Sequence, residues 1–190
     1  MGPGGPRGLQ LRWQRSFDWC GGFDSLALPP LGNVMGNKYW LMKSEPDDYS
    51  IDDLINEQNS TAEWDGVRNY QARNFLRDQI KIGDQVLYYH SNSKPSGVIG
   101  TAKVVRNGYP DFTAWDPNSK HPDPKSTPES PIWYMVDIQA TKKFNQIISL
   151  QQIKQIPELS EMVLVKNSRL SVQPVTKQEF EIIEKIGLSN

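Results

Sequence analysis

The sequence is poor in the residues on which most enzyme chemistry depends. Among its 190 residues there are one cysteine, Cys20, and two histidines, His90 and His121. A single cysteine cannot form an internal disulfide, so we expect a reducing compartment: the cytoplasm or, in a eukaryote, the nucleus. Apolar runs also stay far below the ~18 residues of a membrane helix, and no membrane partner is expected.

Neither sign of charge is in excess. The formal net charge is -1, from 21 basic and 22 acidic residues, which argues against a bulk polyanion binder. Nucleic-acid binding would therefore need locally gathered basic residues and a pocket that adds to the affinity. Hydrophobic residues make up 37% of the chain, enough for one core, and we expect a monomer. Tryptophan is abundant, with six residues.

Motifs for catalysis or cofactor binding are also missing. His90 and Ser91 are neighbours, but adjacent strand residues point to opposite faces, so the pair is weak evidence for a hydrolase. No phosphate-binding loop, dinucleotide fingerprint or zinc-ligand spacing occurs. One acidic group fits a helix N-terminus better than a metal site. It consists of Asp47, Asp48, Asp52 and Asp53. We predict no catalytic residues, metal or cofactor.

Residues 1–36 differ from the rest of the chain, because they are rich in Gly and Pro and show no helical or strand period. They make a poor signal peptide, since Asp24 and two prolines interrupt the apolar stretch. A transit peptide is one interpretation; a true translation start at Met35 is the one we favour. We expect this segment to be disordered and residues 37–190 to form the single domain.

Apolar patterning from Lys38 onward predicts a mixed α+β domain. We expect strands over residues 39–42, 85–89, 98–105, 132–138 and 169–175. We expect helices over residues 50–57, 69–78 and 149–155, and a last one opened by a capping box at 176–179. Residues 107–131 read as a long loop with six prolines. Strands in the middle with flanking helices predict a small mixed β-barrel whose ends are covered by short helices.

Two tryptophans are candidates for a binding site. Trp64 precedes an Asp-Gly turn, where an indole can belong either to the core or to a site. Trp115 lies in the long loop, where it either stacks on a base or pins the loop to the barrel. Trp40 and Trp133 lie in strand patterns and are expected in the core.

Two adjacent tyrosines lie in the strand expected over residues 85–89. Tyr88 and Tyr89 alternate faces, so we expect one inside and the other nearer the surface.

Basic residues cluster near the second predicted helix. Arg68, Arg73 and Arg77 lie within three turns, and Asn69 stands at the helix start, where backbone N–H groups can receive a phosphate. Others flank the strand ends, namely Lys43, Lys94, Lys103 and Arg106. The basic residues read either as phosphate contacts or as a solvated helix face.

Several long motifs occur in an order that resembles one known family. They are residues 40–46 (WLMKSEP), 64–77 (WDGVRNYQARNFLR), 89–92 (YHSN), 109–117 (YPDFTAWDP) and 169–175 (RLSVQPV). Together they resemble an EVE domain, and the resemblance covers residues 38–190. It implies a PUA-like barrel related to YTH domains, which hold a methylated adenine in an aromatic cage.

The resemblance also implies a function and a site. EVE domains are implicated in binding modified bases, notably modified cytosines in DNA, and some bacterial members are thought to act on RNA. The implied base pocket comprises Lys43, Ser44, Trp64, His90, Ser91, Asn92 and Trp115, with Asp116 beside the last. Arg169 and Ser171 would reach the pocket or a phosphate.

We therefore predict a non-catalytic reader of a modified base, with Trp64 and Trp115 facing one another across an accessible hollow. The alternatives are an RNA-binding module of the PUA-like class and a nucleotide-acting enzyme.

Overall fold

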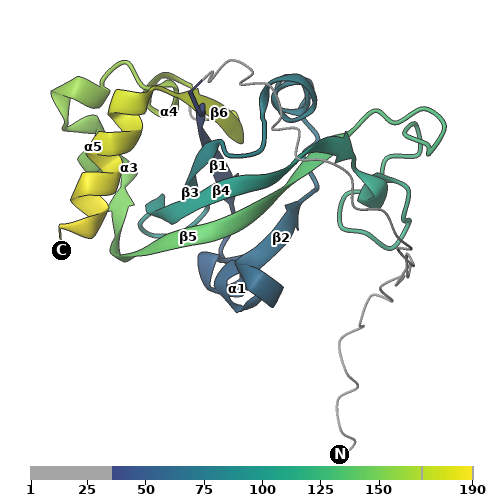
Figure 1. Ribbon diagram of the computed structural model, residues 1–190, viewed down its shortest axis with the longest axis horizontal. Helices are drawn as coiled ribbons and strands as arrows, with labels where there is room; N and C mark the ends of the chain where they lie inside the picture. Colours follow the sequence, from purple (N-terminus) through teal and green to yellow (C-terminus); the bar gives the residue numbers. More distant parts are fainter. Residues whose placement is uncertain (1–35, 168, 190) are drawn as a thin grey trace, which may run out of the picture. The chain divides into compact units, whose positions relative to one another are not determined.

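The computed structural model describes residues 36–167 and 169–189 (Figure 1). The predictions made for residues 1–35, including those on Cys20 and Met35, lie outside the described residues.

The described residues are organised around one curved, six-stranded mixed sheet. Its order is β2-β5-β4-β3-β1-β6, in which only β1 and β3 run parallel. The strands are β1 (Tyr39–Ser44), β2 (Thr61–Trp64), β3 (Gln85–His90), β4 (Gly97–Pro110), β5 (Tyr134–Ser149) and β6 (Val172–Val175). The predicted α+β class is confirmed, but β2 and β6 remain separate edges, so the barrel does not close.

Short helices flank the sheet, as expected. They are α1 (Ile51–Asn56), α2 (Tyr70–Asn74), α3 (Leu150–Lys154), α4 (Val163–Lys166) and α5 (Lys177–Leu188). Single helical turns are η1 (Gln58–Ser60), η2 (Phe75–Gln79), η3 (Phe112–Ala114) and η4 (Pro157–Leu159). In Figure 1, α3, α4 and α5 gather at one end of the sheet, and the loop between β4 and β5 projects from the other.

Helix starts follow the local sequence closely. Ser50 opens α1 with a full capping box in which Asp53 takes the usual place of Glu or Gln, and Thr176 opens α5 in the same way with Glu179. Both boxes had been predicted from the residues.

Apolar side chains cover both faces of the sheet. One cluster gathers Trp40, Met42, Trp64 and Tyr88 with the helices α1 and α2. The other gathers side chains of β3, β4, β5 and β6 against α3, α4 and α5, and Tyr89 belongs to it. The expectation that one of Tyr88 and Tyr89 lies nearer the surface was wrong, because each face has its own core.

Three differences from the predicted elements follow from strand pairing. The strand β2 was not predicted, because its four residues form a strand only by pairing with β5. β4 and β5 run on to Pro110 and Ser149, longer than their apolar patterns, and their ladder contains several register shifts. The long loop is therefore shorter than predicted and spans residues 111–133.

Candidate nucleic-acid interface

Parallel pairing of β1 with β3 places the ends of both strands at one edge of the sheet. Ser44 lies opposite His90, and Lys43 lies opposite Tyr89. Beyond the strand ends, the backbone N–H of Ser91 donates to the Ser44 carbonyl at 2.8 Å. The turn is closed further by the amide of Asn92, which donates to the Glu45 carboxylate at 2.7 Å. Predicted residues that are about 45 positions apart therefore lie side by side.

The His90 ring is held by the start of α1. Its Nε2 atom accepts a hydrogen bond from the backbone N–H of Ile51 at 3.2 Å. Its ring also stands edge-on to Tyr88, with 5.7 Å between the centroids. Burial lowers the pKa of His90, and an accepting Nε2 requires the neutral ring with its proton on Nδ1. His90 therefore acts here as a fixed neutral group.

Lys43 connects this edge to β6. Its backbone N–H donates to the Ser171 carbonyl at 2.9 Å, and its ammonium lies over the Tyr89 ring at 5.2 Å. Partial burial lowers the pKa of the Lys43 ammonium. Ser171 is half-buried and Arg169 is exposed, both just before β6. The structure thus brings Lys43 and Ser171 together and leaves the Arg169 side chain facing solvent.

Trp64 packs against the same region from β2, an edge strand of the sheet. Its ring meets Tyr88 edge-on, with 5.5 Å between the centroids, although β5 and β4 separate their strands in the sheet order. Only strong curvature of the sheet permits that contact. Trp64 is 8% exposed and belongs to the core. The expectation of an open indole facing Trp115 is not met, because packing against Tyr88 buries the Trp64 ring.

Two tyrosines that were not predicted as site residues complete this aromatic group. The Tyr88 hydroxyl donates to the Tyr49 carbonyl at 3.1 Å, and the Ser44 hydroxyl donates to the same oxygen at 2.6 Å. Tyr49 immediately precedes the N-cap of α1, and its half-buried ring packs against the cluster that contains Leu54. An apolar residue before an N-cap, paired with one four positions into the helix, is a sequence signal that could have found it.

The second indole, Trp115, follows η3 in the loop of residues 111–133. It is half-buried, and its Nε1 atom donates to the Ser126 hydroxyl at 3.2 Å. Asp116 next to it is half-buried too and accepts from the backbone of Asn118 at 2.8 Å, which holds a local turn. Both residues are therefore ordered by contacts within their own loop.

A buried carboxylate anchors this loop to the segment after β2. Asp111 is inaccessible to solvent and accepts hydrogen bonds from Thr113 and from the backbone N–H of Gly66. It also forms an ion pair with Arg68, whose Nη1 atom lies 2.6 Å away. The other guanidinium nitrogens of Arg68 donate to the His121 carbonyl. Arg68 was predicted as a phosphate contact, but its guanidinium donates to groups within the protein.

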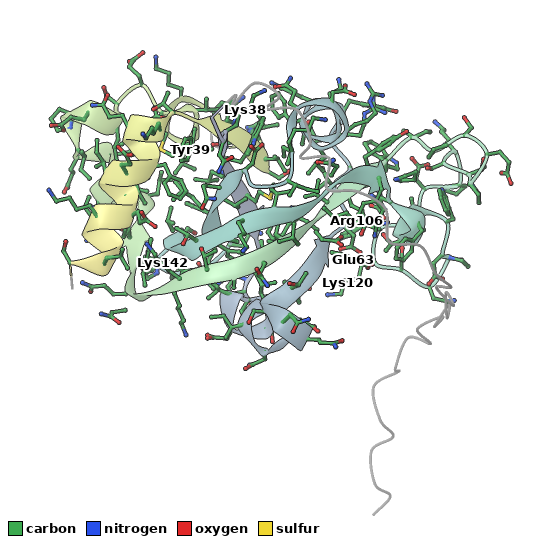
Figure 2. All side chains as sticks on the ribbon, in the orientation of Figure 1. Lys38, Tyr39, Glu63, Arg106, Lys120 and Lys142 are labelled. Atoms are coloured by element: carbon green, nitrogen blue, oxygen red, sulfur yellow. The ribbon has the colours of Figure 1, made fainter. Side chains whose placement is uncertain are left out.

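The tip of the loop reaches across to the segment after β1. The ammonium of Lys120 lies 2.6 Å from the Asp48 carboxylate, and both side chains are exposed. His121 packs on Gly66, which has a φ of +72° and so favours glycine. The loop therefore bridges the segments that follow β1 and β2. In Figure 2 Lys120 lies apart from Tyr39.

The remaining predicted phosphate contacts lie on or beside α2. Asn69 caps this helix by accepting from the Ala72 N–H at 3.0 Å. Arg73 donates to the Ile132 carbonyl at 2.6 Å and lies over the exposed Tyr70 ring. Arg77 is paired with its neighbour Asp78 and remains exposed. Arg73 and Arg77 therefore each use part of the guanidinium group in contacts within the protein. These contacts are exposed or only partly buried.

Two open surface hollows, one along α5 and one beside Leu150 at the start of α3, share no residue with the edge described above. Across residues 36–167 and 169–189, His, Cys, Asp and Glu side chains form no group of three able to hold a metal ion. Within the same residues, no helix is long and apolar enough to cross a membrane.

Comparison with known proteins identifies the family. The chain belongs to the EVE domain family, whose profile matches residues 38–186. Mouse thymocyte nuclear protein 1 is 42% identical over 164 residues, which cover 77% of this chain and 72% of the mouse protein.

Two solved structures resemble the fold. A hypothetical protein from Leishmania major superposes with a TM-score of 0.78 at 45% identity, covering 83% of this chain and 98% of that one. Human THYN1 protein, solved in complex with DNA containing 5-methylcytosine, superposes with a TM-score of 0.76 at 39% identity. That match covers 81% of this chain and 99% of the human one.

Proposed function

We propose that this chain is a non-catalytic reader of DNA that contains a modified cytosine. The observation that carries the proposal is its 39% identity and TM-score of 0.76 to the human THYN1 protein solved with 5-methylcytosine DNA. The aromatic and polar edge at the ends of β1 and β3 is the place we assign to the base. A flipped base there would exchange stacking in the duplex for contacts with aromatic rings and polar groups.

The base pocket comprises the residues predicted from the sequence. Ser44, His90, Ser91 and Asn92 supply polar groups from the ends of the strands, and Lys43 adds a cation. Trp64 packs edge-on against Tyr88, and the two rings form the buried aromatic floor of the pocket rather than an exposed wall. Trp115 and Asp116 approach on the loop of residues 111–133, so the base enters when that loop moves aside. Burying the methyl group of a modified cytosine against an aromatic ring contributes about 1 kcal/mol toward recognition of the modification.

Phosphate contacts come from exposed or half-buried residues on or beside α2 and just before β6. Arg73, Arg77, Asn69 and the residues before β6, Arg169 and Ser171, are the candidates. Arg68 has a different role in the proposal, because its pairing with buried Asp111 positions the loop. With a formal net charge of -1, the chain depends on such local contacts and on the pocket itself.

The hydrogen bonds of His90 and Ser91 support a non-catalytic role. The Nε2 atom of His90 is occupied by the Ile51 N–H, and the Ser91 hydroxyl donates to the Ser44 carbonyl at 3.2 Å. A nucleophile and its base need a mutual hydrogen bond, which this pair does not make. We propose that the protein acts as a monomer and, in a eukaryotic cell, in the nucleus, where the name of its relatives places them.

Binding to matched oligonucleotides tests the function. Fluorescence anisotropy is measured with duplexes that differ at one cytosine, which is unmodified, 5-methylated or 5-hydroxymethylated, and with a transfer RNA as competitor. We expect tighter binding to a modified duplex and recovery of the oligonucleotide unchanged by mass spectrometry. Equal affinity for all duplexes would contradict the proposal, and stronger binding to the transfer RNA would favour the RNA-binding alternative.

A further inference from the structure

The hydroxyl of Tyr49 is a buried polar group without a partner. It is shielded from solvent, and none of the described residues forms a hydrogen bond with it. A buried hydroxyl without a hydrogen bond is destabilising, and such groups are rare in native proteins. Its persistence beside the ends of β1 and β3 calls for a physical reason.

Tyr49 is held firmly in place by its neighbours. Its carbonyl accepts from the hydroxyls of both Ser44 and Tyr88, at 2.6 and 3.1 Å. Its ring packs against the core cluster to which Trp64 and Tyr88 belong. The hydroxyl is therefore presented at a fixed place beside the aromatic floor of the proposed pocket.

The surroundings of Tyr49 keep its hydroxyl protonated. Burial raises the pKa of this phenol, and the negative charges of Glu57, Asp53 and Asp65 raise it further. A neutral phenol is a hydrogen-bond donor that suits an acceptor on a base, such as a ring nitrogen or a carbonyl oxygen.

The loop of residues 111–133 contacts the segment that carries Tyr49. Lys120 of that loop pairs with Asp48, the residue directly before Tyr49. Because that ion pair is exposed, it is weak and can open for a ligand.

We infer that the Tyr49 hydroxyl donates a hydrogen bond to the edge of the base held in this pocket and so helps to determine which base is accepted. The inference rests on the proposed function, and it assigns to that site a residue that carries no charge and was not predicted from the sequence. The protein keeps an unsatisfied donor in its free state because the base satisfies it in the complex.

The substitution Tyr49→Phe separates this role from a structural one. Removing an unsatisfied hydroxyl leaves the ring packing intact, so we expect an unchanged or higher melting temperature. Affinity for the modified duplex should fall about tenfold, as expected for one lost hydrogen bond in a desolvated site. Tyr39→Phe is the matched control, since Tyr39 packs on Phe180 at the start of β1 and lies apart from Lys120 in Figure 2.

The possible outcomes separate a failure of the Tyr49 inference from a failure of the proposed function. If wild-type protein prefers the modified duplex and Tyr49→Phe binds it equally well, the inference falls while the function stands. A clear drop in melting temperature for Tyr49→Phe would also overturn it, because the hydroxyl would then have a partner within the folded protein. If wild-type protein shows no preference among the duplexes, the proposed function fails, and the inference fails with it.

Discussion

The Arg68 guanidinium lies 2.6 Å from the carboxylate of Asp111, the fully buried first residue of the loop of residues 111–133. A buried carboxylate requires a compensating charge, so this pair is a structural anchor and not a surface ion pair.

Arg68→Ala should therefore destabilise the protein. Removing one partner of a buried ion pair leaves the other charge uncompensated, and we expect a loss of about 3 kcal/mol. The free energy of unfolding in urea measures this. Arg77→Ala is the control, because Arg77 pairs with Asp78 on an exposed surface and should cost less than about 1 kcal/mol. Equal effects of the two substitutions would argue against the anchor.

The exposed ion pair of Lys120 and Asp48 should act as a tie that holds the loop of residues 111–133 against the segment after β1. Lys120→Met and Asp48→Asn each remove it, and each should increase the association rate for a modified duplex about twofold, at little cost in stability. Stopped-flow fluorescence measures the rate. The two substitutions change the net charge in opposite directions. Opposite changes in rate would therefore indicate electrostatic steering and contradict a tie.

The two tryptophans should respond differently to truncation. Trp64 is in the core, so Trp64→Ala should cost about 3–5 kcal/mol and compromise the fold. Trp115 is half-buried on the loop, and Trp115→Ala should leave the fold intact while weakening binding to the modified duplex. Circular dichroism with anisotropy measures both properties. A stable Trp64→Ala variant, or unchanged binding by Trp115→Ala, would contradict this assignment.

His90 should make stability depend on pH. Burial lowers its pKa in the folded protein below the value of about 6.5 expected in the unfolded chain, which then binds more protons. Stability that is fully present above pH 6.5 should decline as the pH falls through 6.5 toward the lower folded pKa. Protonation would also break the hydrogen bond from the Ile51 N–H.

Comparison with His90→Gln isolates this contribution, since an amide oxygen can accept the same hydrogen bond without titrating. Unfolding in urea at several pH values between 5 and 8 gives the difference in stability between the two proteins. We expect that difference to shrink or reverse as the medium becomes acidic. A difference that stays constant across the range would show that His90 is not the titrating group.

Local chemistry made part of this structure predictable. The capping boxes at Ser50 and Thr176 depend on residues three positions apart, and both are present in the fold. The apolar patterns of β1 and β3 and the family motifs were also readable. By contrast, β2 escaped prediction, because pairing with β5 makes a strand of residues 61–64.

The site itself was predictable as a set of residue types and not as an arrangement. The sequence alone identified Ser44, His90 and Trp64, because their motifs are contiguous. Only the tertiary structure decided that parallel pairing sets Ser44 against His90, that sheet curvature buries Trp64 against Tyr88, and that Asp111 occupies Arg68. Such contacts join residues 20 to 50 positions apart, and their geometry depends on the packing of the whole sheet, which no local pattern encodes.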